Sequence, residues 1–320
     1  MKKSFSFLII ILVLALLLPV TAQAVQLIPG GQLIGLELSD QSVTVVAFDE
    51  HKSAARSAGM EVGDRITYVD DHPIGCAEDL RQALERSGGS VHVRFLRQDK
   101  EKHLRICPDI TKDGPKLGVY LRQGIHGVGT VTYYDPQSGC FGALGHSVNS
   151  PGGKLLEMAA GNAYEAGIMH IKKGQCGKPG QLMGCMDPTE NIGCLYKNTP
   201  QGVFGKTKQP LPGQALETAS ADQVHTGAAI IRSTVQNGPI QEYSVKILKI
   251  YPTTRAGGRN MLIKITDERL LQTTGGIIQG MSGSPLIQDG KLIGAVTHVL
   301  VNDPTMGYAI FIENMLEAAG

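Results

Sequence analysis

The sequence predicts a mostly β protein of two domains, a small α+β domain followed by a larger domain built almost entirely of antiparallel strands. Three observations support this fold class. The 320 residues leave room for about two domains, and the hydrophobic fraction of 42% is enough for packed cores. The 40 glycines and 16 prolines follow no collagen-like period and indicate many tight turns. The second half of the chain consists mainly of short β-type segments separated by such turns.

The N-terminus has the pattern of an export signal. Lys2 and Lys3 precede the uninterrupted apolar run Phe7–Val20, and Thr21–Ala24 forms a small-x-small end. Residues 1–24 are therefore expected to be either a signal peptide, cleaved after Ala24, or an uncleaved membrane anchor. The anchor is an equal alternative because the whole stretch Ser4–Ala24 is about long enough to cross a bilayer. In both cases the rest of the chain would lie outside the cytoplasm.

Charge and cysteine content narrow the possible functions. The formal net charge is +1 and no long basic stretch occurs. The sequence therefore lacks the clustered positive charge that is typical of nucleic-acid-binding proteins. The cysteines are Cys76, Cys107, Cys140, Cys176, Cys185 and Cys194. Their spacing does not match the close CxxC pairs of structural zinc sites, and no metal or cofactor is implied. One local disulfide is plausible in an exported chain, whereas a weakly oxidising compartment would leave all six as small buried residues.

Residues 25–109 are expected to form the small domain. The predicted strands are Leu33–Leu38, Ser42–Phe48, Val91–Leu96 and His103–Cys107. A short helix is predicted at Ser53–Gly59, and an amphipathic helix at Ala77–Arg86 ends at a Ser-Gly-Gly sequence.

This order of elements resembles a PDZ domain. The resemblance rests on an x-Φ-G-Φ loop formed by Leu33, Ile34, Gly35 and Leu36, on the A-x-x-A-G-x-x-x-G-D-x-I run at Ala55–Ile66, and on the late helix. By this resemblance a peptide strand would add beside the Gly35 strand, and its terminal carboxylate would bind the backbone N–H groups around Gly35. The alternative is a small spacer domain that binds no peptide.

Residues 110–115, with the polar sequence ITKDGP, are expected to be a linker, and residues 116–320 the large domain. The predicted strands of this domain are Leu117–Leu121, Val128–Tyr134, Gln241–Ile250, Met261–Ile265, Lys291–Val301 and Gly307–Ile312. The only helix signal late in the chain is Glu313–Ala319. Many strands separated by Gly and Pro clusters favour a sandwich or barrel over a βαβ sheet.

The segment Gly280-Met281-Ser282-Gly283-Ser284-Pro285 is the strongest chemical signal in the chain. Its glycines permit a tight turn that exposes the Ser282 hydroxyl. The same turn would aim the N–H groups of Gly280 and Ser282 at one point, as an oxyanion hole requires. The segment resembles the G-D-S-G-G-P of chymotrypsin-like serine proteases, a fold of two β-barrels, although Met281 and Ser284 depart from it. The alternative is an ordinary Ser/Gly hairpin turn.

The sequence after this turn predicts a strand, a tight turn and a second strand that ends near His298. In the chymotrypsin-like fold the strand after the serine hairpin lends its edge to the substrate backbone. Thr297, His298 and Val299 are the candidates for this pairing.

A serine hydroxyl is a poor nucleophile without a neighbouring base. Among the nine histidines, His146 is the best candidate, because it follows a glycine-rich strand and precedes a polar turn. The alternatives are His298, His225 and His170.

The base in turn needs an acid that orients its ring. Asp267 ends a predicted strand, and the order His146, Asp267, Ser282 matches chymotrypsin-like enzymes, although their acid normally comes much earlier in the chain. Asp303 and Asp222 are the alternatives.

Over nearly its whole length the chain resembles the stage IV sporulation protein B serine peptidases of endospore-forming bacteria. The resemblance rests on four stretches: I-P-G-G-x-x-I-G at Ile28–Gly35, G-A-L-G-H ending at His146, T-D-x-x-L-L-x-x-T-G-G-I-I-Q-G-M-S-G-S-P at Thr266–Pro285, and G-A-V-T-H-V-L-V-N-D-P at Gly294–Pro304. The catalytic positions of that family fall on His146, Asp267 and Ser282, which favours Asp267 over its alternatives.

The resemblance implies a signalling protease that the forespore exports into the space between the two membranes. It would be membrane-anchored until it cleaves itself, and would then cut a membrane-bound inhibitor so that sigma factor K is activated. Its partners would be protein substrates, including itself and a membrane-bound regulatory complex. Two other functions remain open: a non-catalytic exported PDZ adaptor and a general degradative protease.

Overall fold

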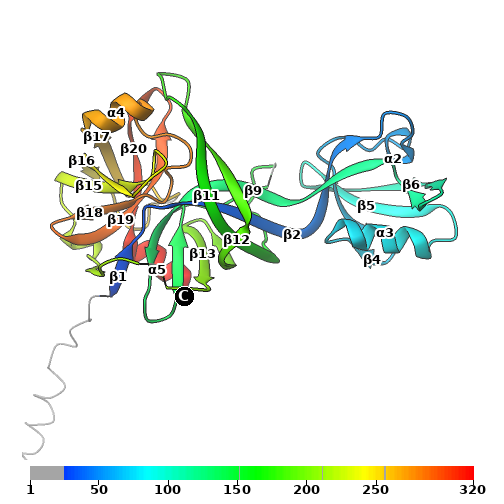
Figure 1. Cartoon of the computed structure of the whole chain (residues 1–320), viewed down its shortest axis with the longest axis horizontal. Coiled ribbons are helices and arrows are strands. Elements are labelled where there is room, and N and C mark those ends of the chain that lie inside the picture. The colour runs from blue at the N-terminus through cyan, green and yellow to red at the C-terminus, as the bar shows by residue number, and fades with distance from the viewer. Residues whose placement is uncertain (1–24, 151, 211, 256) are drawn as a thin grey trace, which may run out of the picture.

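The computed structural model describes residues 25–150, 152–210, 212–255 and 257–320, so the expected signal or anchor at residues 1–24 lies outside the described residues. Among the residues that are described, none of the helices has the length and apolar character needed to span a membrane. Two lobes are joined by a ribbon of two long paired strands, β2 (Leu33–Phe48) and β9 (Val119–Tyr134), as Figure 1 shows.

The first barrel of the large lobe is a ring of six antiparallel strands. Neighbouring strands follow the order β9-β10-β13-β12-β11-β2, and the pairing of β2 with β9 closes the ring. The other four strands are β10 (Cys140–Ala143), β11 (Ala160–Lys172), β12 (Gln181–Thr199) and β13 (Gly202–Thr207), and β1 (Gln26–Pro29) and β14 (Leu216–Glu217) extend one edge. Ile34, Leu36, Phe141 and Val203 lie in its core.

The second barrel closes in the order β15-β16-β17-β20-β19-β18. Its strands are β15 (Gly227–Ser233), β16 (Gln241–Ile250), β17 (Met261–Ile265), β18 (Pro285–Gln288), β19 (Lys291–Leu300) and β20 (Asp303–Phe311). The helices of this part are η1 (Ala221–Gln223), α4 (Glu268–Thr274) and α5 (Ile312–Ala319). Two six-stranded antiparallel barrels confirm the predicted mostly β, double-barrel architecture.

The small lobe packs helix α3 (Ala77–Arg86) against a sheet made of the far ends of β2 and β9 together with β3 (Arg65–Val69), β4 (His72–Pro73), β5 (Val91–Arg97) and β6 (Lys100–Ile106). A short helix α2 (Ala54–Ser57) precedes β3. The Asp79 carboxylate accepts the N–H of Cys76 at the start of α3, while Leu80, Ala83 and Leu84 face the core, so the amphipathic helix is placed as predicted. The expected linker, residues 110–115, instead folds into a hairpin of β7 (Asp109–Thr111) and β8 (Gly114–Lys116).

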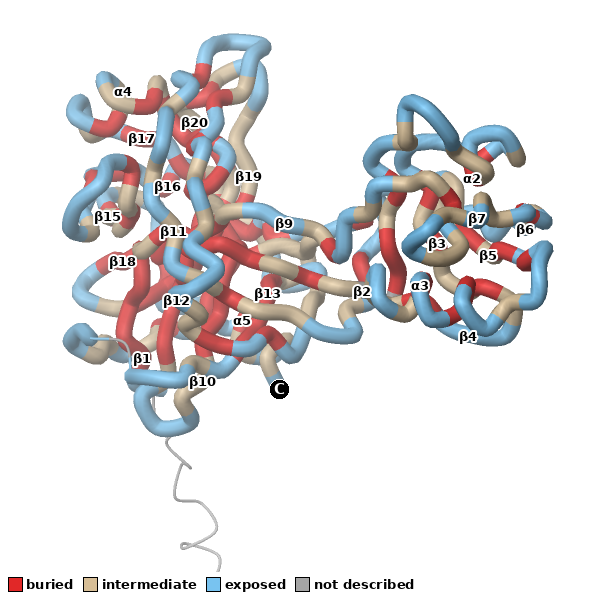
Figure 2. The backbone as a smooth tube through the Cα atoms, turned by 45° about the vertical axis from the view of Figure 1, so that its right-hand side comes forward, coloured by how far each residue is buried: buried red, intermediate tan, exposed pale blue. Residues whose placement is uncertain are grey.

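The small lobe is inserted into the first barrel and does not simply precede it. Residues 26–38, expected to belong to the small domain, form β1 and the first part of β2, and Ile28 and Leu36 lie in the barrel core. From Val43 onward, the buried residues of β2 lie in the core of the small lobe. Figure 2 shows the two buried cores on either side of a more exposed ribbon.

Candidate active site

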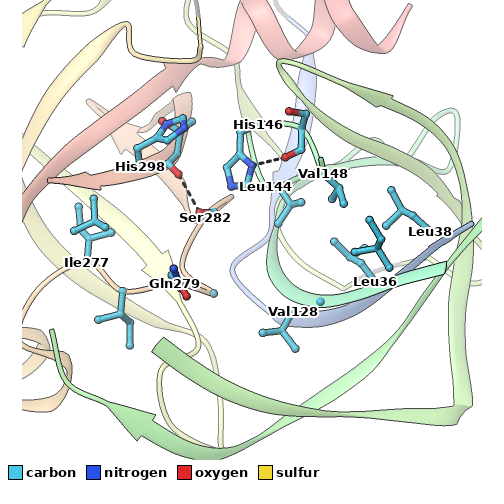
Figure 3. Close-up of a pocket in the computed structure, with 17 residues that line it drawn as sticks. Leu36, Leu38, Val128, Leu144, His146, Val148, Ile277, Gln279, Ser282 and His298 are labelled. Atoms are coloured by element: carbon cyan, nitrogen blue, oxygen red, sulfur yellow. Dashed lines mark hydrogen bonds between the residues drawn. The ribbon is translucent and has the colours of Figure 1, made fainter. Parts of the chain in front are cut away.

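Ser282 and His146 come from different barrels and line one cleft of about 440 Å³. His146 follows β10 of the first barrel, and Ser282 precedes β18 of the second. In Figure 3 the imidazole of His146 lies beside Ser282, with apolar side chains on both sides of the pair. The structure therefore brings together the predicted nucleophile and the predicted base at the junction of the two barrels.

The serine turn is held by β9 of the first barrel. The Thr130 N–H donates to the carbonyl of Ser282 at 3.0 Å, and the Thr130 hydroxyl donates to the carbonyl of Gly280 at 2.8 Å. Gly283 has φ of 95°, and a Cβ atom there would lie 2.0 Å from the Thr130 carbonyl oxygen. Only glycine fits this left-handed position against the neighbouring backbone, which explains the turn sequence physically.

The turn leaves two backbone donors free at the expected oxyanion position. Within the described residues, neither the N–H of Gly280 nor that of Ser282 donates to a protein acceptor, and both residues line the cleft. Gly280 has φ of 100°, a conformation that favours glycine. Two free N–H groups flanking a nucleophile are able to stabilise the negative oxygen of a tetrahedral intermediate.

The Ser282 hydroxyl donates to the backbone carbonyl of Thr297 at 3.0 Å. In the described structure no hydrogen bond joins it to His146. The hydroxyl of the nucleophile is therefore engaged with a carbonyl oxygen. Its side chain has to rotate before a base can accept its proton.

His146 has its ring oriented by a backbone group. Its Nδ1 lies 2.9 Å from the carbonyl oxygen of Ser147, an atom that only accepts, so Nδ1 carries the proton and Nε2 keeps its lone pair. Burial lowers the pKa of His146 below its ordinary value, and the Ser147 carbonyl partly offsets this effect. The ring is thus neutral at neutral pH and available as a base.

His298 packs against this base, with the two ring centroids 5.5 Å apart. Burial, followed by the nearby His146 and Arg259, lowers the pKa of His298 to about 4. A second neutral ring therefore forms a wall of the cleft without adding a charge.

The structure does not bring Asp267 to His146, which corrects the predicted triad. Asp267 caps the N-terminus of α4, where its carboxylate accepts the N–H of Arg269 at 2.9 Å and pairs with the Arg269 guanidinium. It also accepts the N–H of Ser244 on β16. The hydrogen bonds from Arg269 and then those from the backbone lower the pKa of Asp267 to about 2. Helix capping occupies this carboxylate, and none of the cleft-lining residues is acidic.

The remaining alternatives lie away from the cleft, apart from His298. The carboxylate of Asp303 accepts from Thr305, and His225 pairs with Asp289 on the surface at 2.8 Å. Asp222 belongs to η1 and His170 to β11, and neither lines the cleft. Among the described residues, no group of three or more His, Cys, Asp or Glu side chains is placed to hold a metal ion.

The expected substrate strand borders the cleft. Thr297, His298 and Val299 all line it, and at this level β19 pairs with β20 on one side. The pairing of β19 with β18 ends at Ala295, so the other edge of these three residues faces the cleft. An extended peptide is able to pair with that edge.

A hairpin that sequence reasoning missed supports the oxyanion turn. The end of the β11–β12 hairpin reaches the second barrel, where Gln279 donates to the carbonyl of Gly180 at 3.0 Å and accepts the N–H of Leu182 at 2.8 Å. Leu182 is fully buried, and a Cβ on Gly280 would lie 2.8 Å from its side chain. The hairpin thus fixes the backbone immediately before the two free donors.

The predicted peptide-binding loop at Leu33, Ile34, Gly35 and Leu36 is wrong. These residues pair with β9 on one edge and, from Ile34 onward, with β11 on the other, so no peptide strand has room to add there.

A groove of about 380 Å³ lies instead in the small lobe, between α3 and Leu117–Leu121. Lys116-Leu117-Gly118-Val119 repeats the x-Φ-G-Φ pattern, and Gly118 has φ of 67°. Among the described residues the N–H groups of Leu117 and Gly118 have no protein acceptor. This second x-Φ-G-Φ sequence was the signal that could have located the groove.

The six cysteines are free thiols, and each is partly or fully exposed rather than buried. The expectation of small buried residues is therefore wrong, and the plausible local disulfide is not formed.

Two family models match the chain. Residues 113–316 match the family model described as SpoIVB peptidase S55, and residues 31–107 match the PDZ domain model. Two curated relatives share short stretches with the chain. One, R01501 of Rhizobium meliloti (strain 1021), is named as a candidate zinc metalloprotease and is 34% identical over 87 residues, which cover 27% of this chain and 23% of the relative. The other, Atu1380 of Agrobacterium fabrum, has the same kind of name and is 33% identical over 104 residues, 32% of this chain and 26% of the relative. The chain therefore spans about a quarter of the length of these relatives.

Distant likenesses exist among solved structures. The inactive form of the Rv3671c protease has a TM-score of 0.37 at 13% identity and covers 60% of this chain and 82% of its own. The active form of that protease, from M. tuberculosis, has a TM-score of 0.35 at 15% identity, with coverage of 61% and 73%.

Proposed function

The chain belongs to the SpoIVB peptidase S55 family and is a serine peptidase with a PDZ domain, and we propose that it is a regulatory endopeptidase that acts outside the cytoplasm during sporulation. It cleaves itself and then cuts a membrane-bound inhibitor, which leads to sigma factor K activation. The proposed location is the space between the two forespore membranes, with membrane association through residues 1–24 until self-cleavage. The regulatory role is supported by the family resemblance together with a peptide groove separate from the catalytic cleft.

The observation that carries the proteolytic mechanism is the shared cleft of Ser282 and His146 beside two free backbone donors. The Ser282 hydroxyl turns from the Thr297 carbonyl toward Nε2 of His146, which takes its proton as the oxygen attacks the peptide carbonyl. The N–H groups of Gly280 and Ser282 hold the resulting oxyanion. His146 then donates the proton to the leaving amine, and water repeats the sequence on the acyl-enzyme.

Charge stabilisation on His146 is weaker than in a complete triad. Its Nδ1–H donates to the Ser147 carbonyl, which fixes the tautomer but carries no full negative charge. The site is thus a Ser–His pair oriented by a backbone oxygen, and its proposed turnover is correspondingly modest, as suits a regulatory enzyme.

The test is labelling of the purified full chain with a fluorophosphonate. Labelling should occur at Ser282 and disappear in His146→Ala, while His225→Ala, which alters a histidine on the surface, should label like the unmodified protein. In the native host, Ser282→Ala should leave the chain at full length. Absence of labelling in folded protein would favour a non-catalytic PDZ adaptor, and ready digestion of casein would favour a general degradative protease.

A further inference from the structure

A largely buried ion pair lies where the PDZ domain meets the large lobe. Arg65, at the start of β3, donates to the carboxylate of Asp99 at 2.7 Å, and the two side chains are 12% and 10% exposed. Asp99 belongs to the turn between β5 and β6 and has φ of 58°. The pair is therefore held at the end of the PDZ domain that faces the barrels.

The Asp99 carboxylate also contacts the large lobe. The Ser150 hydroxyl lies 3.1 Å and 3.3 Å from its two oxygens, and Ser150 is 7% exposed. The contact is close, because a Cβ atom on Gly152 would lie 1.9 Å from one of the Asp99 oxygens. Apart from the β2–β9 ribbon, this turn thus gives the PDZ domain a polar attachment to the first barrel.

Ser150 belongs to the loop that begins at the catalytic base. His146 donates to the carbonyl of Ser147, and the next residue, Val148, lines the catalytic cleft. The Ser150 N–H donates to the carbonyl of Lys154 at 2.8 Å, which joins described residues on the two sides of residue 151. Only three residues separate His146 from Ser150, so this turn and the carbonyl that orients the imidazole belong to one short segment.

The base of the loop is fixed to the barrel by Asn198. Its side-chain oxygen accepts the N–H of Val148 at 2.9 Å, and its side-chain nitrogen donates to the carbonyls of Val148 and Leu156. The loop is therefore held at two places, at its base by Asn198 of β12 and at its tip by Asp99 of the PDZ domain.

The geometry points to Asp99 as a positioning residue for His146, an inference that rests on the proposed function. Its carboxylate, charge-compensated by Arg65, binds the Ser150 hydroxyl and sets the loop that holds the catalytic imidazole. The PDZ domain thereby has a direct mechanical connection to the catalytic centre, in addition to its peptide groove. Binding of a ligand, or of a segment of the chain itself, would change the contact between Asp99 and Ser150 if it rotated the PDZ domain about the β2–β9 ribbon.

The experiment uses the full chain with Asp99→Gly, since glycine keeps the left-handed turn and removes only the side chain. Asp70→Gly is the matched control: Asp70 also has positive φ (50°) and accepts a backbone N–H, from His92, within the PDZ domain. Ser150→Ala removes the other partner, and Ser150→Thr keeps the hydroxyl. The measurements are the rate of fluorophosphonate labelling of Ser282, kcat and KM on a peptide substrate, and hydrogen exchange of residues 147–156.

We expect Asp99→Gly and Ser150→Ala each to slow labelling roughly tenfold, with kcat lowered and KM changed little, because neither residue lines the cleft. The double variant should be no slower than either single one, and Ser150→Thr should retain the rate. Hydrogen exchange of residues 147–156 should rise in Asp99→Gly and not in Asp70→Gly.

Unchanged exchange of residues 147–156 in Asp99→Gly, or equal effects in Asp70→Gly, would overturn the proposal. If the unmodified chain is not labelled while exchange still responds to Asp99→Gly, the attachment stands and the serine peptidase mechanism fails. The two proposals are therefore tested separately.

Discussion

The Ser282 hydroxyl donates a hydrogen bond to the carbonyl oxygen of Thr297 at 3.0 Å, although His146 lines the same cleft. Replacing this hydrogen bond by one to His146 costs little, since a typical internal hydrogen bond contributes about 1 kcal/mol. Catalysis therefore requires the Ser282 hydroxyl to exchange its present acceptor for His146. Binding of a peptide along β19 would favour this rotation, because the peptide would lie beside the carbonyl that now accepts the proton.

Ser282→Ala should abolish turnover without unfolding the protein. The turn is held by hydrogen bonds from the N–H and the hydroxyl of Thr130 to the carbonyls of Ser282 and Gly280. The substitution does not touch these bonds, so the free energy of unfolding should change by only about 1 kcal/mol. Activity should fall by roughly 10⁴-fold or more. Thermal unfolding and peptide hydrolysis measure the two effects, and a cooperative unfolding transition near that of the unmodified chain with substantial remaining activity would remove Ser282 as the nucleophile.

Asp267→Asn separates helix capping from catalysis. Asparagine caps helices about as well as aspartate, so stability should fall only through the lost ion pair with Arg269, by about 1 kcal/mol. Labelling of Ser282 in the folded protein should stay within a few-fold. An orienting aspartate would behave differently, because its replacement by asparagine lowers turnover by about 10⁴-fold. A loss of that size in folded Asp267→Asn would show that Asp267 reaches His146 in the active state.

The pH dependence of labelling should reflect the lowered pKa of His146. The base acts only when neutral, and burial favours the neutral form, so the acid limb should lie below the ordinary value of 6.5. Labelling should therefore persist as the pH falls through 6.5 and be lost at lower pH. A limb at or above 6.5 would indicate that a carboxylate has replaced the Ser147 carbonyl beside the ring.

Substrate preference should follow the apolar walls of the cleft. Ile277 and Leu144 line it, and His298 adds a neutral ring, whereas no acidic side chain does. Peptides with Val, Ala or Leu next to the cut bond should be hydrolysed at least about tenfold faster than those with Arg or Asp. Val299→Gly, which removes a side chain from the cleft wall, should extend the preference to larger apolar residues. A preference for Arg or Lys in a peptide library would contradict this expectation.

The elements with strong local patterns were predicted well from the sequence. Gln241–Ile250 and Met261–Ile265 alternate clearly and form β16 and β17 with those bounds, and Ala77–Arg86 has both a helical face and a stop signal. The β11–β12 hairpin was missed because its strands are rich in glycine and polar residues and have no clear alternation. Their length comes from pairing with each other and with neighbouring barrel strands. Helix α4 was missed because its seven residues follow an aspartate that was assigned to catalysis instead of capping.

In the site, local chemistry predicted the serine turn and its base, but not the orienting group. Glycines around Ser282 mark a backbone requirement that is visible in the sequence. By contrast, His146 is oriented by the backbone carbonyl of Ser147. Every residue type has a backbone carbonyl, so the sequence contains no signal for this contact. The two x-Φ-G-Φ sequences at Gly35 and Gly118 were indistinguishable locally, and only pairing across the sheet decided which one is free.

Each strand of the ribbon continues from the barrel into the inserted PDZ domain, although the pairing of the two strands shifts register between Leu38 and Val43. As a consequence, the catalytic lobe is discontinuous along the polypeptide, and a fragment starting at residue 113 would lack β1 and the barrel part of β2. Proteolytic removal of residues up to about 25 spares every strand that the structure describes, whereas trimming through residue 38 would open the first barrel and expose Phe141 and its neighbours. An intact catalytic lobe therefore requires the chain to be present from β1 onward.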